Sequence, residues 1–280
     1  MKIASFEFDG RRTYGVVDGD AIVEASAGFR KRHPDLRAVL AAEASQQLAD
    51  DASGNAIELA AISYLPTIPN PDKIICIGIN YRPHLEEMGR SPPDHPVMFV
   101  RFAGSQVGHE QAIVKSRATE QYDFEGELGV VIGRRARYVS RDAAFEYIAG
   151  YTCFMDGTAR DWQKHTTQFT PGKNFQRSGA MGPTLVSRDE IPDVTDLTLQ
   201  TRVNGAVMQE GRLSELIFDI PYLIEYLSTF TELLPGDVIA TGTPGGVGAA
   251  RTPPIWLADG DEVAVDIAGV GALVNRVRAD

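Results

Sequence analysis

Short β-prone segments run through most of this chain, and they restrict its fold more than any other feature. Most are rich in β-branched and aromatic residues, and Gly, Pro, Asn or Asp residues separate one from the next. The Asn204-Gly205 pair stands between two such segments and is typical of a tight β-hairpin. The predicted strands of this region are 96–102, 127–133, 148–156, 182–187, 197–205, 237–242 and 261–278.

The N-terminal part is organised differently. Residues 2–24 predict three short strands, because two Asp-Gly pairs place turns between apolar segments. Helix-forming residues follow in the first half of 34–62, and a proline-rich piece then leads to an apolar strand. We therefore predict a small N-terminal α+β domain, residues 1–70, before a larger β-dominated domain, residues 71–280.

Helices are expected to be few in the larger domain. The best candidates are 141–148 and 214–230, and Pro221 starts, kinks or interrupts the second of them. With so many predicted strands and so few helices, the chain is expected to be a β-rich α+β protein.

Charge and composition exclude several classes of partner. The 280 residues carry a formal net charge of −11, which disfavours nucleic acid and anionic membranes but permits a small anionic substrate at a locally positive site. Cys76 and Cys153 lie in apolar segments without zinc or disulfide spacing, so buried thiols in a reducing compartment are expected. The sequence shows no signal peptide and no apolar stretch of membrane-spanning length, so we expect a soluble cytoplasmic protein.

Two glutamates flank a glycine at the start of an apolar strand, in the stretch 122–133 (YDFEGELGVVIG). Residues two apart on a strand face the same side, so Glu125 and Glu127 point the same way. Asp156 ends another apolar strand at the start of a loop, where sites are often built. Three converging carboxylates would suit a hard divalent cation such as Mg²⁺, Mn²⁺ or Ca²⁺. The alternatives are solvent-facing glutamates and an Asp156 that caps a turn.

A histidine and a glutamate three residues apart form a second candidate group. His84 and Glu87 share one face if this stretch makes a helical turn, and the carboxylate would then orient the imidazole as a general base. The stretch is rich in Gly, Pro and Asp, which is typical of a loop that closes over substrate. The alternative is an exposed histidine on a surface turn.

Cationic and polar residues form a third group after Asp156. Arg160 and Gln163 share its helical face if 157–165 turns as a helix, and Lys173 follows. Beside a metal, such cations bind a substrate carboxylate or stabilise an enolate, although solvated surface charge is the alternative. The glycine-rich loop 240–248 brings backbone N–H groups and Thr243 near an anion, without the ending of a P-loop.

Seven motifs in this order resemble the fumarylacetoacetate hydrolase superfamily. The resemblance covers the chain from about residue 71 to the C-terminus, and residues 1–70 are similar to the small N-terminal domain found in many members. Any one motif is weak evidence, whereas the ordered set is highly specific. The motifs are CIGINYRPHLEEM, DFEGELGVVIG, GYTCFMDGTARDWQ, GKNF, MGPTLV, VNGAVMQEG and LLPGDVIATGTPGGVG.

The resemblance implies a mixed β-sandwich roll, a divalent metal and typically a homodimer. The metal is usually Mg²⁺ and sometimes Mn²⁺ or Ca²⁺, and Glu125, Glu127 and Asp156 match its ligands. His84 and Glu87 match the dyad that activates water in hydrolases.

The resemblance also implies a set of residues around a bound 2-oxo acid. Lys173 is expected to support the enolate electrostatically, but many members read Lys-x-Phe-Asp where this chain has Lys173-Asn-Phe-Gln176. The residues expected to contact or polarise the substrate are Tyr81, Arg160, Gln163, Lys173 and Thr243.

These features predict a metal-dependent hydrolase that cleaves a C–C bond in a 2,4-dioxo acid of the acylpyruvate type. The metal would stabilise an enolate, and His84, held by Glu87, would deprotonate the attacking water. The same core also supports decarboxylation of oxaloacetate-like acids and isomerisation of unsaturated 2-oxo diacids, which need no attacking water. The non-enzymatic alternative is a protein that binds metal and 2-oxo acid without catalysis.

Overall fold

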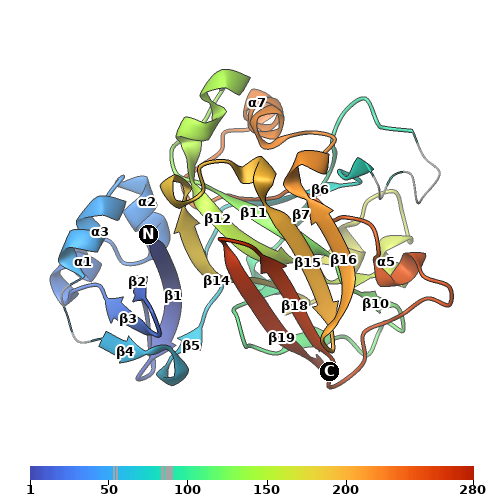
Figure 1. The fold of residues 1–280 in the computed structure, drawn as a ribbon, viewed down its shortest axis with the longest axis horizontal. Helices are drawn as coiled ribbons and strands as arrows, with labels where there is room; N and C mark the ends of the chain where they lie inside the picture. Colours follow the sequence, from blue (N-terminus) through green and yellow to red (C-terminus); the bar gives the residue numbers. More distant parts are fainter. Residues whose placement is uncertain (53, 55, 83–84, 86–90) are drawn as a thin grey trace.

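Two β-sheets packed against each other form the body of the protein (Figure 1). The computed structural model describes residues 1–52, 54, 56–82, 85 and 91–280. Within these residues the fold is a strand-rich mixture of α and β structure, as the sequence predicts.

The larger sheet has twelve strands in the described part of the chain, and most neighbours are antiparallel. Two short strands lie off its main path: β5 (Ser63–Tyr64) pairs with β1, and β8 (Gln106–Val107) pairs with β14. The main path runs β4 (Ala56–Glu58), β3 (Ala21–Glu24), β2 (Arg11–Asp18), β1 (Lys2–Phe8), β14 (Gly179–Ser187), β12 (Ile148–Met155), β11 (Gly126–Ile132), β17 (Val238–Ala240), β6 (Ile74–Gly78) and β7 (Val97–Arg101).

The smaller sheet packs β15, β18 and β19 against β11, β12 and β14 of the larger one, and apolar side chains from both fill the space between them. A separate two-stranded ribbon joins β10 (Tyr122–Asp123) to β13 (Thr158–Ala159). The smaller sheet runs β16 (Ala206–Arg212), β15 (Thr198–Val203), β18 (Glu262–Ile267), β19 (Gly271–Ala279) and β9 (Ile113–Lys115).

The helices are short. Figure 1 shows α1, α2 and α3 grouped beside the N-terminal strands, with α7 apart from them at the top of the view. None of the described helices has the length and apolar character needed to cross a membrane. The α-helices are α1 (Ala27–Arg32), α2 (Leu36–Ala41), α3 (Ser45–Asp51), α5 (Arg160–Gln163), α6 (Thr170–Lys173) and α7 (Ile220–Phe230). The 3-10 helices are η1 (Leu59–Ala61), η2 (Ala103–Ser105), η3 (Arg141–Tyr147), η4 (Arg188–Glu190), η5 (Val194–Asp196), η6 (Leu213–Glu215) and η7 (Gly248–Ala250).

Local sequence signals explain several element boundaries. Asn204-Gly205 forms the tight connection between β15 and β16, and both residues have positive φ, as a primed hairpin turn requires. Pro221 lies in the first turn of α7, where its missing N–H costs nothing, and Asp219 caps that turn by accepting from the Tyr222 N–H at 2.9 Å. The predicted helix at 141–148 is the 3-10 helix η3 rather than an α-helix.

The N-terminal strands belong to the same large sheet as the rest of the chain. Lys2 and Ile3 of β1 pair with Val186 and Leu185 of β14. Buried residues of both parts share one apolar cluster, in which Phe29 and Leu36 join Phe154 and Met181. The boundary near residue 70 therefore stays a prediction about sequence organisation, since backbone pairing and packing both cross it.

Candidate active site

Strand pairing brings three carboxylates together. Glu125 and Glu127 flank Gly126 at the start of β11, and Asp156 follows the end of β12. The two strands are antiparallel with Gly126 opposite Met155, so Asp156 lies beside Glu125 and its N–H donates to the Glu125 carbonyl at 2.8 Å. The three side chains, here called the carboxylate triad, are buried, and each offers an oxygen within 4.8 Å of the others.

Burial makes the charge of this triad costly. Desolvation raises the pKa of Glu127 well above its ordinary value, and the charges of Asp156 and Glu125 add to the effect. Two opposing influences are smaller: the Lys173 ammonium, and the Gly242 N–H that donates to Glu127 Oε2 at 2.8 Å. The triad therefore requires cationic partners to remain ionised.

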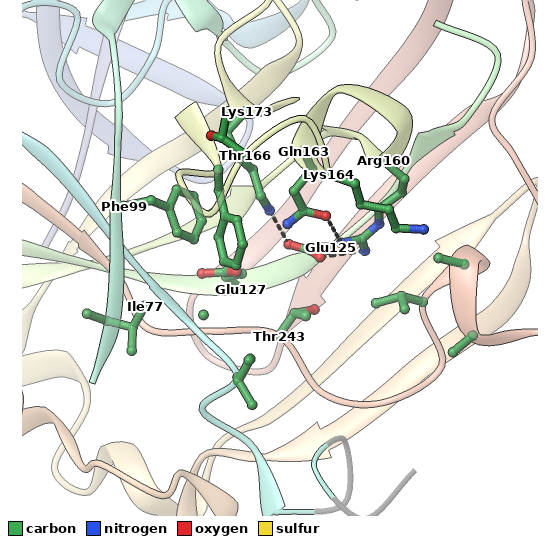
Figure 2. Close-up of a pocket in the computed structure, with 16 residues that line it drawn as sticks. Ile77, Phe99, Glu125, Glu127, Arg160, Gln163, Lys164, Thr166, Lys173 and Thr243 are labelled. Carbon is green, nitrogen blue, oxygen red and sulfur yellow. Dashed lines mark hydrogen bonds and ion pairs between the residues drawn. The ribbon is translucent and has the colours of Figure 1, made fainter. Parts of the chain in front are cut away.

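Two helices supply such partners (Figure 2). Lys173, at the end of α6, places Nζ 2.6 Å from Glu125 Oε2. The same Nζ lies 2.6 Å from Asp156 Oδ2. Arg160, at the start of α5, places Nη2 2.5 Å from Glu125 Oε1 and donates from Nη1 to Gln163 Oε1 at 3.1 Å. Burial lowers the pKa of Lys173, but the Asp156 and Glu125 carboxylates raise it by more, so the side chain is an ammonium ion at neutral pH.

Arg101 is a third cation of the cluster, and the sequence analysis missed it. It ends β7 with a fully buried guanidinium that pairs with Asp156 Oδ1. The same group donates to the Gly157 carbonyl at 3.0 Å and to the hydroxyls of Ser178 at 2.8 Å and Ser105 at 3.1 Å. The available signal was an arginine at the end of an otherwise apolar strand segment.

Asp123 is a fourth carboxylate that sequence reasoning missed. Its Oδ2 lies 2.8 Å from Arg160 Nε, and its two oxygens accept the N–H groups of Gly248 at 2.8 Å and Ala249 at 3.0 Å. Asp123 stands two residues before Glu125, so the same alternation that pairs the glutamates could have pointed to it. Its contacts therefore connect Arg160 to the first two residues of η7.

A cavity of about 480 Å³ opens on this cluster (Figure 2). Four residues predicted to contact substrate, Arg160, Gln163, Lys173 and Thr243, line it together with Glu125 and Glu127. The Lys173 ammonium lies 4.7 Å from the centre of the Phe99 ring. The apolar side chains of the lining are Ile77, Ile79, Phe99, Phe169, Val247, Ala249 and Ala250.

Three residues predicted for the site are not found in the cavity lining that the structure describes: Tyr81, His84 and Glu87. Tyr81 is fully buried and is not among the described lining residues, and its hydroxyl has no hydrogen-bond partner in the described part of the structure. A substrate contact by Tyr81 therefore stays a prediction. His84 and Glu87 lie outside the described residues, so the predicted base also stays a prediction.

The donor set of the triad fits a hard divalent cation. Its three carboxylates offer only oxygen ligands, which suit Mg²⁺, Mn²⁺ or Ca²⁺ better than a soft metal. Among the buried side chains of the described part of the site, four carboxylates face three cations when all are ionised. A divalent cation would reverse the sign of that balance, as binding an anionic substrate requires.

Gly126, between the two glutamates, is required by the packing of the two sheets. A Cβ at this position would lie 2.0 Å from Thr201 Oγ1 of β15 and 3.3 Å from Val265 Cγ1. We expect Gly126→Ala to lower the free energy of unfolding by about 2 kcal/mol. Adding Thr201→Ala should restore part of the loss, because it removes the shortest contact. Urea denaturation of both variants checks this, and wild-type stability of Gly126→Ala would contradict it.

Comparison with known proteins shows the family of the chain. The family model described as fumarylacetoacetate (FAA) hydrolase C-terminal matches residues 73–278. Oxaloacetate tautomerase YisK of Bacillus subtilis (strain 168) is 43% identical over 241 residues, which span 84% of this chain and 80% of that protein.

Two solved structures are similar over the whole chain. Fumarylacetoacetate hydrolase from psychrophilic Exiguobacterium antarcticum has a TM-score of 0.89 and 34% identity, and the match covers 100% of each chain. Maleylpyruvate hydrolase from Sphingobium sp. SYK-6, solved in complex with manganese(II) ion and pyruvate, has a TM-score of 0.80 and 25% identity, with 100% of this chain and 99% of that chain covered. The chain therefore belongs to the fumarylacetoacetate hydrolase family and is an enzyme of that superfamily.

Proposed function

We propose that the protein interconverts the keto and enol forms of a 2-oxo diacid of the oxaloacetate type, with a divalent cation at the carboxylate triad. The observation that carries the proposal is the position of Lys173 and Arg160, which flank the triad on one cavity. Enolisation transfers a proton from the carbon beside a carbonyl to a base, for which the sequence predicts His84, and leaves negative charge on the oxygen. A site of fixed positive groups, closed off from water, stabilises such charge most effectively.

The residues of the chain divide this task. Lys173 is held beside the triad by Glu125 and Asp156, and its ammonium group would stabilise the negative charge on the enolate oxygen. Arg160 has five N–H donors and uses three described bonds, to Asp123, Glu125 and Gln163, so donors remain for a substrate carboxylate. A bound divalent cation would supply Lewis-acid stabilisation of the same developing charge.

The relatives support this substrate class. YisK, at 43% identity, is named an oxaloacetate tautomerase, and the maleylpyruvate hydrolase structure contains manganese and pyruvate, itself a 2-oxo acid. The cavity has room for a small diacid and for a substituent against its apolar lining.

Hydrolysis of an acylpyruvate is the second candidate, and the relatives named as hydrolases favour it. It needs a water molecule and a base in addition to the enolate site, and the sequence assigns these to His84 and Glu87. We expect His84→Ala to abolish hydrolysis while metal binding, measured by calorimetry, is unchanged. Hydrolytic activity in His84→Ala would remove that residue from the mechanism.

One assay compares both candidates. Protein treated with EDTA is supplied with Mg²⁺ or Mn²⁺, and three products are followed: the enol of oxaloacetate by ultraviolet absorbance, pyruvate from oxaloacetate, and the two acids released from an acylpyruvate. We expect metal to restore enol–keto exchange faster than it restores either cleavage. Equal exchange with and without metal would contradict the proposal, and faster acylpyruvate cleavage would favour the hydrolase.

A further inference from the structure

Gln209 is a buried polar residue that reaches the triad from the other sheet. It lies in β16 of the smaller sheet with 1% of its surface exposed, whereas the triad is built on β11 and β12 of the larger sheet. Its carboxamide makes three hydrogen bonds, and each goes to a segment of the site. A buried amide with every group bonded fixes its partners relative to one another.

The first bond holds the residue between the two glutamates. The Gly126 N–H donates to Gln209 Oε1 at 3.0 Å. Gly126 is also held from its carbonyl side, because the Thr243 hydroxyl donates to the Gly126 oxygen at 2.9 Å. Both polar groups of this peptide segment are therefore fixed, and with them the directions in which Glu125 and Glu127 leave the backbone.

The other two bonds hold the loop that follows β17. Gln209 Nε2 donates to Thr243 Oγ1 and to the Pro244 carbonyl, both at 2.8 Å. The preceding residue of this loop, Gly242, donates its N–H to Glu127 Oε2 at 2.8 Å. The Gln209 carboxamide thus fixes the position of Glu127 in two ways. It holds the neighbouring backbone at Gly126, and it holds the loop whose Gly242 N–H bonds the Glu127 carboxylate.

Close packing between β16 and the same loop keeps Gln209 next to Thr243 and Pro244. A Cβ on Gly211 would lie 2.7 Å from Pro244 Cβ, and a Cβ on Gly246 would lie 2.2 Å from the Met208 carbonyl oxygen. Arg251 donates from Nη2 to that Met208 carbonyl at 2.6 Å. The loop therefore lies directly on β16, which is the edge strand of the smaller sheet.

We propose that Gln209 is a positioning residue for the metal site: it fixes Gly126, and through Thr243 the loop at Gly242, so that Glu125 and Glu127 are held in the geometry that a cation needs. The inference rests on the proposed metal site and adds to it a residue that touches neither metal nor substrate. Glutamine suits the position because one amide accepts from Gly126 and donates to Thr243 and Pro244. Glutamate cannot donate when ionised, and methionine offers neither function.

The test measures Mn²⁺ affinity by isothermal titration calorimetry on the EDTA-treated full chain. We expect Gln209→Met to weaken Mn²⁺ binding by about tenfold or more, the usual effect of losing a residue that orients a ligand. The matched control is Asn275→Leu in β19 of the same sheet. Asn275 is 2% exposed, and its amide donates to the carbonyls of Gly108 and Gln111 at 2.8 Å, outside the site. The Asn275→Leu variant should have a lower free energy of unfolding but wild-type Mn²⁺ affinity.

Thr243→Val gives an independent reading if Gln209→Met does not fold. Valine has nearly the shape of threonine, so the substitution removes the hydroxyl and its bonds to Gln209 and Gly126 without creating a cavity. We expect a smaller loss of Mn²⁺ affinity than in Gln209→Met. In the double variant the two losses should not add, since both remove the same network. Additive losses, wild-type affinity in Gln209→Met, or an equal loss in Asn275→Leu would each overturn the proposal. A wild-type chain that binds no Mn²⁺ would instead overturn the metal site itself.

Discussion

Glu127→Gln is expected to abolish metal-dependent turnover and, in EDTA, to make the protein more stable. The amide keeps an oxygen that can accept from Gly242 N–H, but it removes one negative charge from a buried triad. The loss of a ligand should weaken Mn²⁺ binding by more than about 100-fold, the upper end of what an orienting residue contributes.

The gain in stability has a defined pH dependence. Burial raises the pKa of Glu127, so between its unfolded and folded pKa values the folded state binds more protons than the unfolded state. The wild-type free energy of unfolding in EDTA should therefore fall as pH rises above about 4.3, the ordinary value for glutamate. Glu127→Gln should lack this slope.

Urea denaturation in EDTA from pH 5 to pH 8 and Mn²⁺ calorimetry check both parts. Glu262→Gln, at a partly exposed residue of β18, is the control that changes net charge by the same amount. Wild-type Mn²⁺ affinity in Glu127→Gln would remove that residue from the metal site. An unchanged pH slope would show that its charge is not costly in the fold.

Arg101→Met is expected to lower the free energy of unfolding by about 3–5 kcal/mol, because it leaves the Asp156 carboxylate without one of its two buried cations. Both side chains of the pair are 0% exposed, so water cannot replace the lost partner. The Ser105 and Ser178 hydroxyls and the Gly157 carbonyl would lose their donor as well.

Arg135→Met is the matched control. Arg135 pairs with Glu232 at 2.9 Å, but its side chain is 70% exposed, so its loss should cost less than about 1 kcal/mol. Asp156→Asn in the Arg101→Met background should recover part of the loss by removing the unpaired charge. Equal destabilisation by Arg101→Met and Arg135→Met, measured by urea denaturation, would contradict the argument.

Local patterns predicted those parts of the structure that depend on neighbouring residues. Alternation placed Glu125 and Glu127 on one side of a strand, and the Asn204-Gly205 turn placed a hairpin, because both are set within a few residues. Residue patterns also proposed Asp156 as the third carboxylate, and the resemblance to a family favoured that role over a turn cap. The resemblance likewise favoured a site role for Arg160 and Lys173, for which the residues alone left solvated surface charge as the alternative.

The missed residues depend on contacts between distant segments. Arg101 and Asp156 are 55 positions apart, and an arginine at a strand end has the same local signature whether it is buried or solvated. Gln209 meets Gly126 across two sheets, so no periodicity could reveal it. The pairing of β1 with β14 also joins residues on opposite sides of the predicted boundary, and no local signal indicates it.

The pairing of β1 with β14 means that the N-terminal strands cannot be removed without exposing the larger sheet. Strand β14 has β1 on one side and β12 on the other, and Phe29 and Leu36 cover apolar residues of the sheet that carries the triad. Removing residues 1–70 would expose an edge strand together with an apolar face, which is the surface that drives aggregation. The strands of residues 1–70 are thus part of the same sheet that carries the triad. Residues 1–70 and 71–280 should therefore unfold in one cooperative transition.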